Sequence, residues 1–149
     1  MTSPIVILQG PPHETRLSER HKIIDHVDTG KLLVSRRDDG VIHVFYKDYT
    51  EIDVPTQMDA HFAFVELTSG KPSRFIIEAG DYCSITKEAR ENAYTLEDIS
   101  PMRATAVVVN NIAYKLIADF YIKFTKPKFP YKVFNSFDKA ITWLKEQTV

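Results

Sequence analysis

One segment constrains the fold of this chain more than any other: residues 104–109, Ala-Thr-Ala-Val-Val-Val, are small or β-branched and carry no charge. Such a run favours a β-strand, because branched side chains pack well on a pleated surface. The lack of charge further indicates a strand that is buried on both faces. Strands of this kind lie in the middle of sheets covered by helices on both sides, so the segment predicts an α/β domain.

Strand-like and helix-like segments alternate along the rest of the chain. Asp38-Asp39-Gly40 separates two β-rich runs, residues 32–34 and 41–46, and predicts a hairpin because glycine tolerates the positive φ of a tight turn. Further short strands are expected at residues 75–79 and 131–134. The expected order β-β-α-β-α-β-α-β-α predicts a mixed, mostly parallel sheet with an N-terminal hairpin and about four helices.

The expected helices begin at residues that favour helix N-termini. The first runs from Pro55 to Thr68, and the spacing of Met58, Phe62 and Val65 places these side chains on one apolar face, with Phe64 and Leu67 beside them. The others are expected from Ser84 or Thr86 to about Tyr94, over residues 112–124, and after Asn135 or Ser136, with a separate helical turn at residues 95–98.

The length of 149 residues fits one domain, and 44% hydrophobic residues suffice for a core. Gly10-Pro11-Pro12 interrupts the start of the chain, and residues 13–22 are mostly polar. We therefore expect a loosely attached N-terminal segment over residues 1–25 and a single domain over residues 26–149. No internal repeat is evident.

The charges nearly balance, with 19 Lys and Arg against 20 Asp and Glu, so the sequence gives no electrostatic reason to expect nucleic acid or an anionic membrane as a partner. No apolar run approaches the roughly 20 residues of a membrane-spanning helix. Cys83 is the single cysteine, which excludes an intramolecular disulfide. Because the start of the chain also lacks a signal-peptide pattern, we expect a cytoplasmic protein.

Several motifs carry a family resemblance. Residues 137–144 read Phe-x-x-Ala-x-x-Trp-Leu, and the other stretches are Glu-Ala-Gly at 78–80, Ser-Ile-Thr-Lys-Glu-Ala-Arg at 84–90 and Val-Asn-Asn at 109–111. With the hairpin and the order of the elements, they resemble the SpoIIAA-like (STAS-type) bacterial domains over about residues 31–146. The resemblance implies a SpoIIAA-like fold and a non-enzymatic regulatory module that binds a protein partner, with a homodimer as one possible assembly.

The resemblance also points to a regulatory position. In the anti-sigma-factor antagonists of this type, a phosphorylatable Ser or Thr begins the helix after a central strand. The corresponding stretch holds Ser84 and Thr86, although Asp81 is followed by Tyr82 rather than by serine. A helix N-terminus stabilises a phosphate, so these two residues are candidates for a phosphate or partner site. The simpler interpretation is that one of them is a plain N-cap.

A second candidate site lies at the end of the best strand. In open α/β sheets, ligands bind beyond the carboxyl ends of the strands. Asn110 and Asn111 follow residues 104–109 directly, and we expect them to form a small polar crevice with Glu78, Asp81 and Lys115. Capping of the next helix would also explain the two asparagines.

No catalytic motif is evident, and we expect neither an enzyme nor a cofactor. The glycines are isolated, which excludes the P-loop and the dinucleotide fingerprint. No pair among the five histidines has metal-binding helical spacing, so no metal site is expected, and no motif supplies a base for Cys83.

A basic, aromatic stretch and a set of aromatic side chains each allow a second interpretation. The lysines and aromatic residues of 123–132 suit a protein-contact surface or a solvated helix end. The alternative function is a small hydrophobic-ligand or lipid-binding protein, by analogy with SEC14-like modules of related fold. Its pocket would be lined by aromatic side chains that otherwise pack in the core, namely Phe62, Phe64, Phe120, Tyr121 and Phe124.

Overall fold

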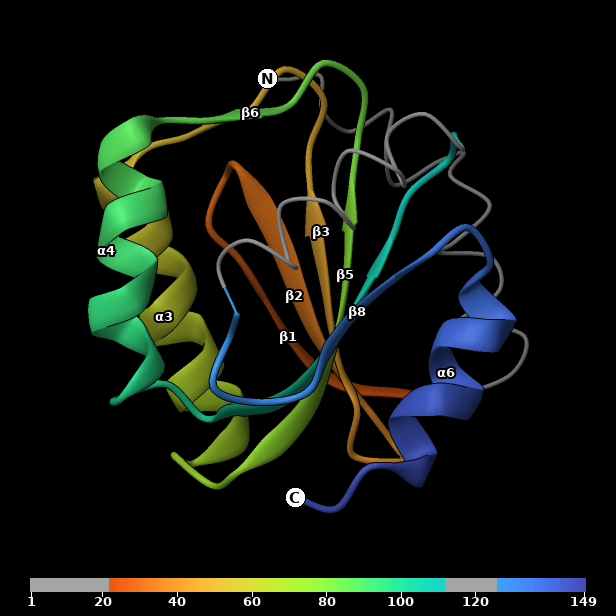
Figure 1. Ribbon diagram of the computed structural model, residues 1–149. Coiled ribbons are helices and arrows are strands. Elements are labelled where there is room, and N and C mark those ends of the chain that lie inside the picture. The colour runs from red at the N-terminus through yellow and green to blue at the C-terminus, as the bar shows by residue number, and fades with distance from the viewer. Residues whose placement is uncertain (1–21, 112–125) are drawn as a thin grey trace.

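The computed structural model describes residues 22–111 and 126–149, which form a mixed β-sheet with helices on both faces (Figure 1). The six sheet strands described follow the spatial order β1-β2-β3-β5-β7-β8. Neighbours among β1, β2 and β3 are antiparallel, whereas β3, β5, β7 and β8 run parallel. The bounds are β1 (Ile23–Asp28), β2 (Leu32–Arg37), β3 (Ile42–Tyr46), β5 (Ser73–Ala79), β7 (Met102–Val108) and β8 (Tyr131–Phe134). The predicted α/β class, hairpin and mostly parallel sheet are confirmed.

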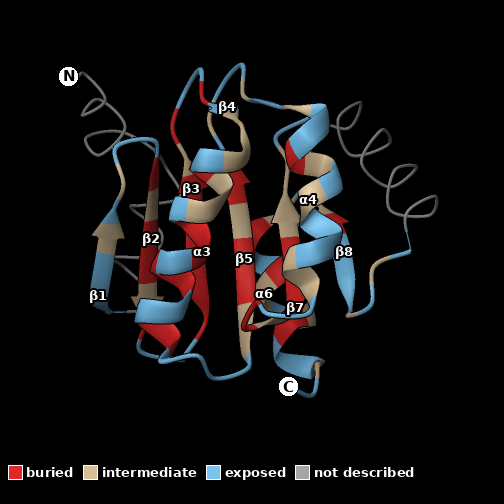
Figure 2. Ribbon diagram, turned by 90° about the vertical axis from the view of Figure 1, so that its left-hand side faces the viewer, coloured by how far each residue is buried: buried red, intermediate tan, exposed pale blue. Residues whose placement is uncertain are grey.

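The uncharged run forms most of β7, between β5 and β8. Ala104, Thr105 and Ala106 are consecutive and all buried, so both faces of this strand are covered, as predicted. Figure 2 shows the buried positions concentrated in β2, β3, β5 and β7, with more exposure in β1 and β8. The hairpin turns at Gly40, whose φ of +85° strongly favours glycine.

Two helices cover one face of the sheet and a third lies on the other (Figure 1). α3 (Val54–Thr68) matches the first predicted helix, and Asp53 caps it by accepting the N–H of Thr56 at 2.9 Å. α4 (Lys87–Glu97) is continuous and includes residues 95–97. The separate helical turn expected at residues 95–98 is therefore wrong. α6 (Phe137–Glu146) begins after the cap Ser136. The helix expected over residues 112–124 lies outside the described residues.

The alternation of side chains along the strands divides the core into two apolar clusters. The cluster beneath α3 takes one set of alternating strand residues, and the cluster beneath α6 takes the other. The first contains Leu32, Val34, Ile42, Val44 and Phe75 with Ala60, Ala63, Phe64 and Leu67 of α3. The second contains Val41, Ile76, Ala104 and Ala106 with Phe137, Ala140 and Leu144 of α6.

The core face of α3 differs from the predicted one. Phe62 is 63% exposed and Val65 is 37% exposed, whereas Ala60, Ala63, Phe64 and Leu67 are buried. Phe64 and Leu67 of the predicted face are buried, but Ala60 and Ala63 take the place expected for Phe62 and Val65. Phe62 therefore lies on the water side of the helix.

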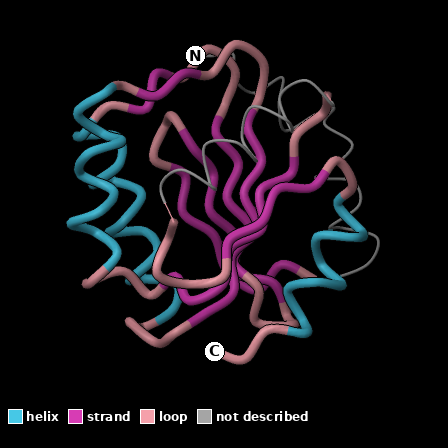
Figure 3. The backbone as a smooth tube through the Cα atoms, in the orientation of Figure 1, coloured by secondary structure: helices cyan, strands magenta, loops and turns pink. Residues whose placement is uncertain are grey.

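Three strands were not expected from the sequence. β1 begins at Ile23, three residues before the domain boundary expected at residue 26, and Ile23 and Val27 pack against the two apolar clusters. β4 (Glu51–Ile52) and β6 (Ser84–Ile85) pair in parallel as a second small sheet. Figure 3 shows this pair at the top of the molecule, where the chain enters α3 and α4.

Phe75 and Phe62 provide a matched test of this core. Phe75 is fully buried and its ring meets that of Phe64 edge to face, with centroids 4.8 Å apart. Phe75→Ala should lower the free energy of unfolding by about 3–5 kcal/mol, because it leaves a cavity. Phe62→Ala should change it by less than about 0.5 kcal/mol. Urea denaturation measures both, and equal losses would contradict this arrangement of α3.

Candidate functional site

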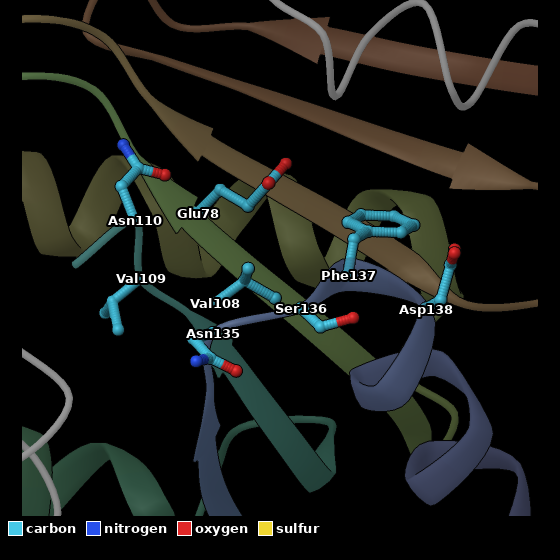
Figure 4. A pocket seen from close by; sticks show the side chains of 8 residues that line it. All are labelled: Glu78, Val108, Val109, Asn110, Asn135, Ser136, Phe137 and Asp138. Atoms are coloured by element: carbon cyan, nitrogen blue, oxygen red, sulfur yellow. The ribbon is translucent and has the colours of Figure 1, made fainter. Parts of the chain in front are cut away.

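A polar crevice of about 370 Å³ opens at the carboxyl ends of β5, β7 and β8 (Figure 4). This edge of parallel strands is where open α/β sheets generally bind ligands. The lining offers two carboxylates, two amides and one hydroxyl, which suits a ligand that donates hydrogen bonds. The lining residues are Glu78, Val108, Val109, Asn110, Asn135, Ser136, Phe137 and Asp138.

One residue that lines this crevice, Glu78, belongs to a buried pair with His43. Glu78 Oε2 is 2.7 Å from His43 Nε2, and the two residues are 8% and 2% exposed. They come from the neighbouring parallel strands β5 and β3, and the ring of Phe137 meets the imidazole edge-on, with centroids 5.9 Å apart. A buried carboxylate is tolerated only with such a partner. The pair therefore fixes the orientation of the Glu78 carboxylate beside the crevice.

Other buried polar residues share this face of the sheet. Ser35 is the cross-strand partner of His43, and Arg37 is only 2% exposed. The Arg37 guanidinium donates two hydrogen bonds to Asp39, at 3.2 and 2.8 Å, and lies 5.8 Å from the Phe137 ring centroid. The core cluster beneath α3 is made of apolar residues. Most of the buried polar side chains in the described sheet therefore lie on the face covered by α6.

The structure brings together part of the crevice expected from the sequence. Glu78 and Asn110 line the same cavity. Asp81 lies instead in the loop after β5, where its N–H donates to Asp48 Oδ1 at 2.7 Å. Asn111 is exposed and does not line the cavity, and Lys115 lies outside the described residues.

Sequence reasoning missed the contribution of Asn135 and Asp138 to the crevice. Asn135 was considered only as a helix cap, and Asp138 stands in the first turn of α6. The signal that could have found them is the parallel pairing of β8 with β7, because it brings the ends of both strands to the same edge.

The two phosphate candidates occupy different positions. Thr86 is the N-cap of α4, and its hydroxyl accepts the N–H of Ala89 at 3.1 Å. Ser84 is exposed in β6, and its N–H donates to the Thr50 carbonyl at 3.0 Å. The capping role expected for one of the two residues therefore falls to Thr86.

Cys83 directly precedes Ser84 and is half-buried. Its thiol donates to the Lys47 carbonyl at 3.1 Å. Burial raises the pKa of Cys83, and the nearby Asp48 and Asp81 carboxylates raise it further against two opposing backbone hydrogen bonds, at Thr50 and Gly80. The thiol is consequently protonated at neutral pH and is a poor nucleophile.

The loops after β3 and β5 share a short sequence pattern. Each reads Asp-Tyr-x-x-Ile, at residues 48–52 and 81–85. Each then runs through a two-residue strand to the cap of a helix, Asp53 for α3 and Thr86 for α4. Five residues with two variable positions are too short a match to stand out in the sequence without the pairing of β4 with β6.

The two tyrosines of this repeat stack in solvent. Tyr49 and Tyr82 have φ values of 61° and 59°, and they are 74% and 78% exposed. Their ring centroids are 5.3 Å apart, with an interplanar angle of 14°. We call Asp48, Tyr49, Asp81 and Tyr82 the tyrosine tip. Hydrogen bonds join the two loops beside the rings.

Hydrogen bonds and a close backbone approach connect the two loops. The N–H of Tyr49 donates to the Asp81 carbonyl at 2.8 Å, and the N–H of Gly80 donates to the Tyr46 carbonyl at 2.7 Å. A Cβ on Gly80 would lie 2.2 Å from Asp48 Oδ1 and 2.8 Å from the Asp48 nitrogen. Glycine is therefore required at residue 80 for this approach.

The histidines and acidic residues form no metal site in the described part of the chain. Within residues 22–111 and 126–149, no three His, Cys, Asp or Glu residues gather to hold an ion. His61 is buried on α3, and its Nδ1 has no hydrogen-bond partner there. His26 is exposed on β1, while His13 and His21 lie outside the described residues.

Comparison with known proteins identifies a family without an assigned activity. A family model described as a domain of unknown function, DUF7793, matches residues 35–148, which include the crevice and the tyrosine tip. No curated protein and no solved structure matches the chain. None of the helices within the described ranges is long and apolar enough to span a membrane.

The environment of Cys83 predicts slow chemical labelling. At pH 7.5 the folded chain should react with iodoacetamide at least about 10-fold more slowly than the chain unfolded in urea, because the raised pKa leaves little thiolate. The rate should rise with pH. Mass spectrometry of timed samples measures the labelling, and equal rates in the two states would show that the thiol is exposed and ionised.

Proposed function

The chain belongs to the DUF7793 family of domains of unknown function, and we propose that it is a non-enzymatic regulatory module that binds a partner protein through the tyrosine tip. The observation that carries this proposal is the stacked pair itself. Tyr49 and Tyr82 together place two large aromatic rings in water, at equivalent positions of two loops. Exposed tyrosines of this kind are typical of the residues that dominate protein–protein binding energy.

The backbone conformation of the pair supports a role outside the core. A left-handed backbone costs a residue with a large side chain about 1–2 kcal/mol. Neither ring recovers that cost by burial, because about three quarters of each residue remains exposed. Strained residues of this kind cluster at binding sites, where the surrounding structure holds them in place.

The rigidity of the tip also favours binding. The rings support each other, and Tyr49 and Asp81 are joined by a backbone hydrogen bond of 2.8 Å. Side chains that are already ordered lose little conformational entropy when a partner arrives. A preformed aromatic pair therefore makes a more effective contact surface than two mobile side chains.

The SpoIIAA-like arrangement and the regulatory role belong to the same proposal. What supports them is the N-terminal hairpin, the parallel strands that follow it, and the Phe-x-x-Ala-x-x-Trp-Leu pattern in α6. Ser84 is the better phosphate position of the two, because it is exposed, lies two residues beyond Tyr82 and does not cap a helix. A phosphate there would change the charge of the tip.

Peptides selected from a displayed random library on the full chain test the proposed surface. The double variant Tyr49→Gly, Tyr82→Gly should weaken their binding by at least about 30-fold, as the loss of a hot spot does. Its unfolding free energy should not fall, because glycine adopts positive φ without strain. Fluorescence anisotropy measures the affinities, and Tyr94→Ala, at an exposed tyrosine of α4, is the control. Undiminished binding of every selected peptide to the double variant would refute the proposal.

A second candidate function is favoured by the crevice. Glu78 lines this cavity while its Oε2 is held by His43 at 2.7 Å. The carboxylates and amide oxygens that line the crevice suit a small ligand that carries an ammonium group or other hydrogen-bond donors. The lining is more polar than the hydrophobic or lipid ligand considered from the sequence would require.

A thermal-shift series with small primary amines tests this second function. Binding at millimolar amine should raise the Tm of the full chain by about 3 °C, because a ligand that binds only the folded state stabilises it. Asn110→Ala and Asn135→Ala should each reduce the shift. The adjacent Asn111→Ala is the matched control, since Asn111 does not line the cavity. A shift that is equal in all variants would locate amine binding elsewhere.

A further inference from the structure

Acidic residues outnumber basic ones in the two loops that carry the tyrosine tip. The two loops and the starts of the helices that follow, residues 48–53 and 81–88, contain a single basic residue, Lys87. The acidic residues in the same stretches are Asp48, Glu51, Asp53, Asp81 and Glu88. Because the whole chain has a net charge of only −1, this excess is local. The tip therefore presents a negative field to an approaching partner.

The nearest lysines of the neighbouring strands are engaged away from the tip. The Lys47 ammonium is largely buried and lies 2.8 Å from the Asp28 carboxylate. The Lys31 ammonium donates to the Thr56 hydroxyl at 3.2 Å. The Arg90 guanidinium donates to the Ile85 carbonyl at 3.1 Å, so its charge lies near the second loop. The five carboxylates still outnumber Lys87 and Arg90 in and beside these stretches.

Resting on the interaction proposed above, we infer that the partner segment presents an arginine, whose guanidinium stacks on an outer face of Tyr49 or Tyr82 and pairs with the adjacent carboxylates. The nearly parallel rings cover one face of each other and leave the opposite faces outward. An aspartate, Asp48 or Asp81, directly precedes each ring. A planar cation can use both features at once, because it lies flat on an aromatic face while its N–H groups reach a carboxylate.

The same features disfavour other occupants. Lysine offers a compact, strongly hydrated charge that cannot stack as a plane. Single-stranded nucleic acid could stack its bases, but its phosphates would be repelled by the carboxylates. A second copy of the chain meeting tip to tip would oppose two sets of like charges.

Titration of the full chain with small probes tests the inference directly. The probes are N-acetyl-arginine amide, the lysine amide, and the citrulline amide, which keeps the planar shape without the charge. NMR should show that the arginine probe shifts the ring signals of Tyr49 and Tyr82 at least about 3-fold more than the lysine probe, with little response to citrulline. The shifts should shrink as salt is added, because the pairing is exposed.

Variants separate the charge from the rings. Asp81→Asn should weaken the arginine response at least about 3-fold while the rings remain. The matched control is Glu66→Gln, an exposed carboxylate on α3 outside these loops. The amide spectrum of each variant verifies that it is folded.

The outcomes distinguish the inference from the proposed function. Selected peptides that depend on the tip and share an arginine support both. Selected peptides that depend on the tip but lack arginine, or equal responses to citrulline and arginine, overturn the arginine inference and leave the interaction function standing. An oligouridine probe that shifts the two rings would overturn it in favour of base stacking. Selected peptides that ignore the double glycine variant would instead refute the interaction function.

Discussion

The parallel pairing of β3 with β5 is the constraint on which both candidate sites depend. In this register His43 lies opposite Ile76 and Tyr46 opposite Ala79, and the same offset continues through Glu51 and Ser84 in the second small sheet. Two loops that leave neighbouring strands at the same level, with the same number of residues, must run side by side. Tyr49 and Tyr82 stack because they occupy equivalent positions in that register.

The two faces of the sheet bury different kinds of side chain. The face beneath α3 is packed with apolar side chains, and it supplies stability through residues such as Phe75 and Leu32. The opposite face includes Arg37, His43 and Glu78 among its buried residues; Arg37 pairs with Asp39, and His43 and Glu78 are hydrogen-bonded to each other. Buried ion pairs contribute little net stability compared with apolar packing. Of these residues, Glu78 also lines the polar crevice.

Local patterns predicted those parts of the fold that are decided locally. The uncharged β7, the hairpin at Gly40 and the helix from Pro55 each follow from a few consecutive residues. The pairing of His43 with Glu78, the stacking of the tyrosines and the addition of Asn135 to the crevice join segments that are far apart in the sequence. These depend on strand order and register, which single-sequence periodicity does not determine. The edge strand β1 was missed for a related reason, since Asp25, His26 and Asp28 give it the polarity of a loop.

Both candidate sites lie along one short stretch of chain. Glu78 faces the crevice, and Tyr82 stands four residues later, with Gly80 between them in close contact with Asp48. That contact leaves no room for a side chain, so a displacement of Gly80 must also move the Asp48 loop. The Gly80–Asp48 contact is therefore the route by which a ligand at Glu78 would be coupled to the two rings, if it displaced Gly80. In that case linkage would make the coupling reciprocal, and a partner bound at the tip would alter the affinity of the crevice by the same factor.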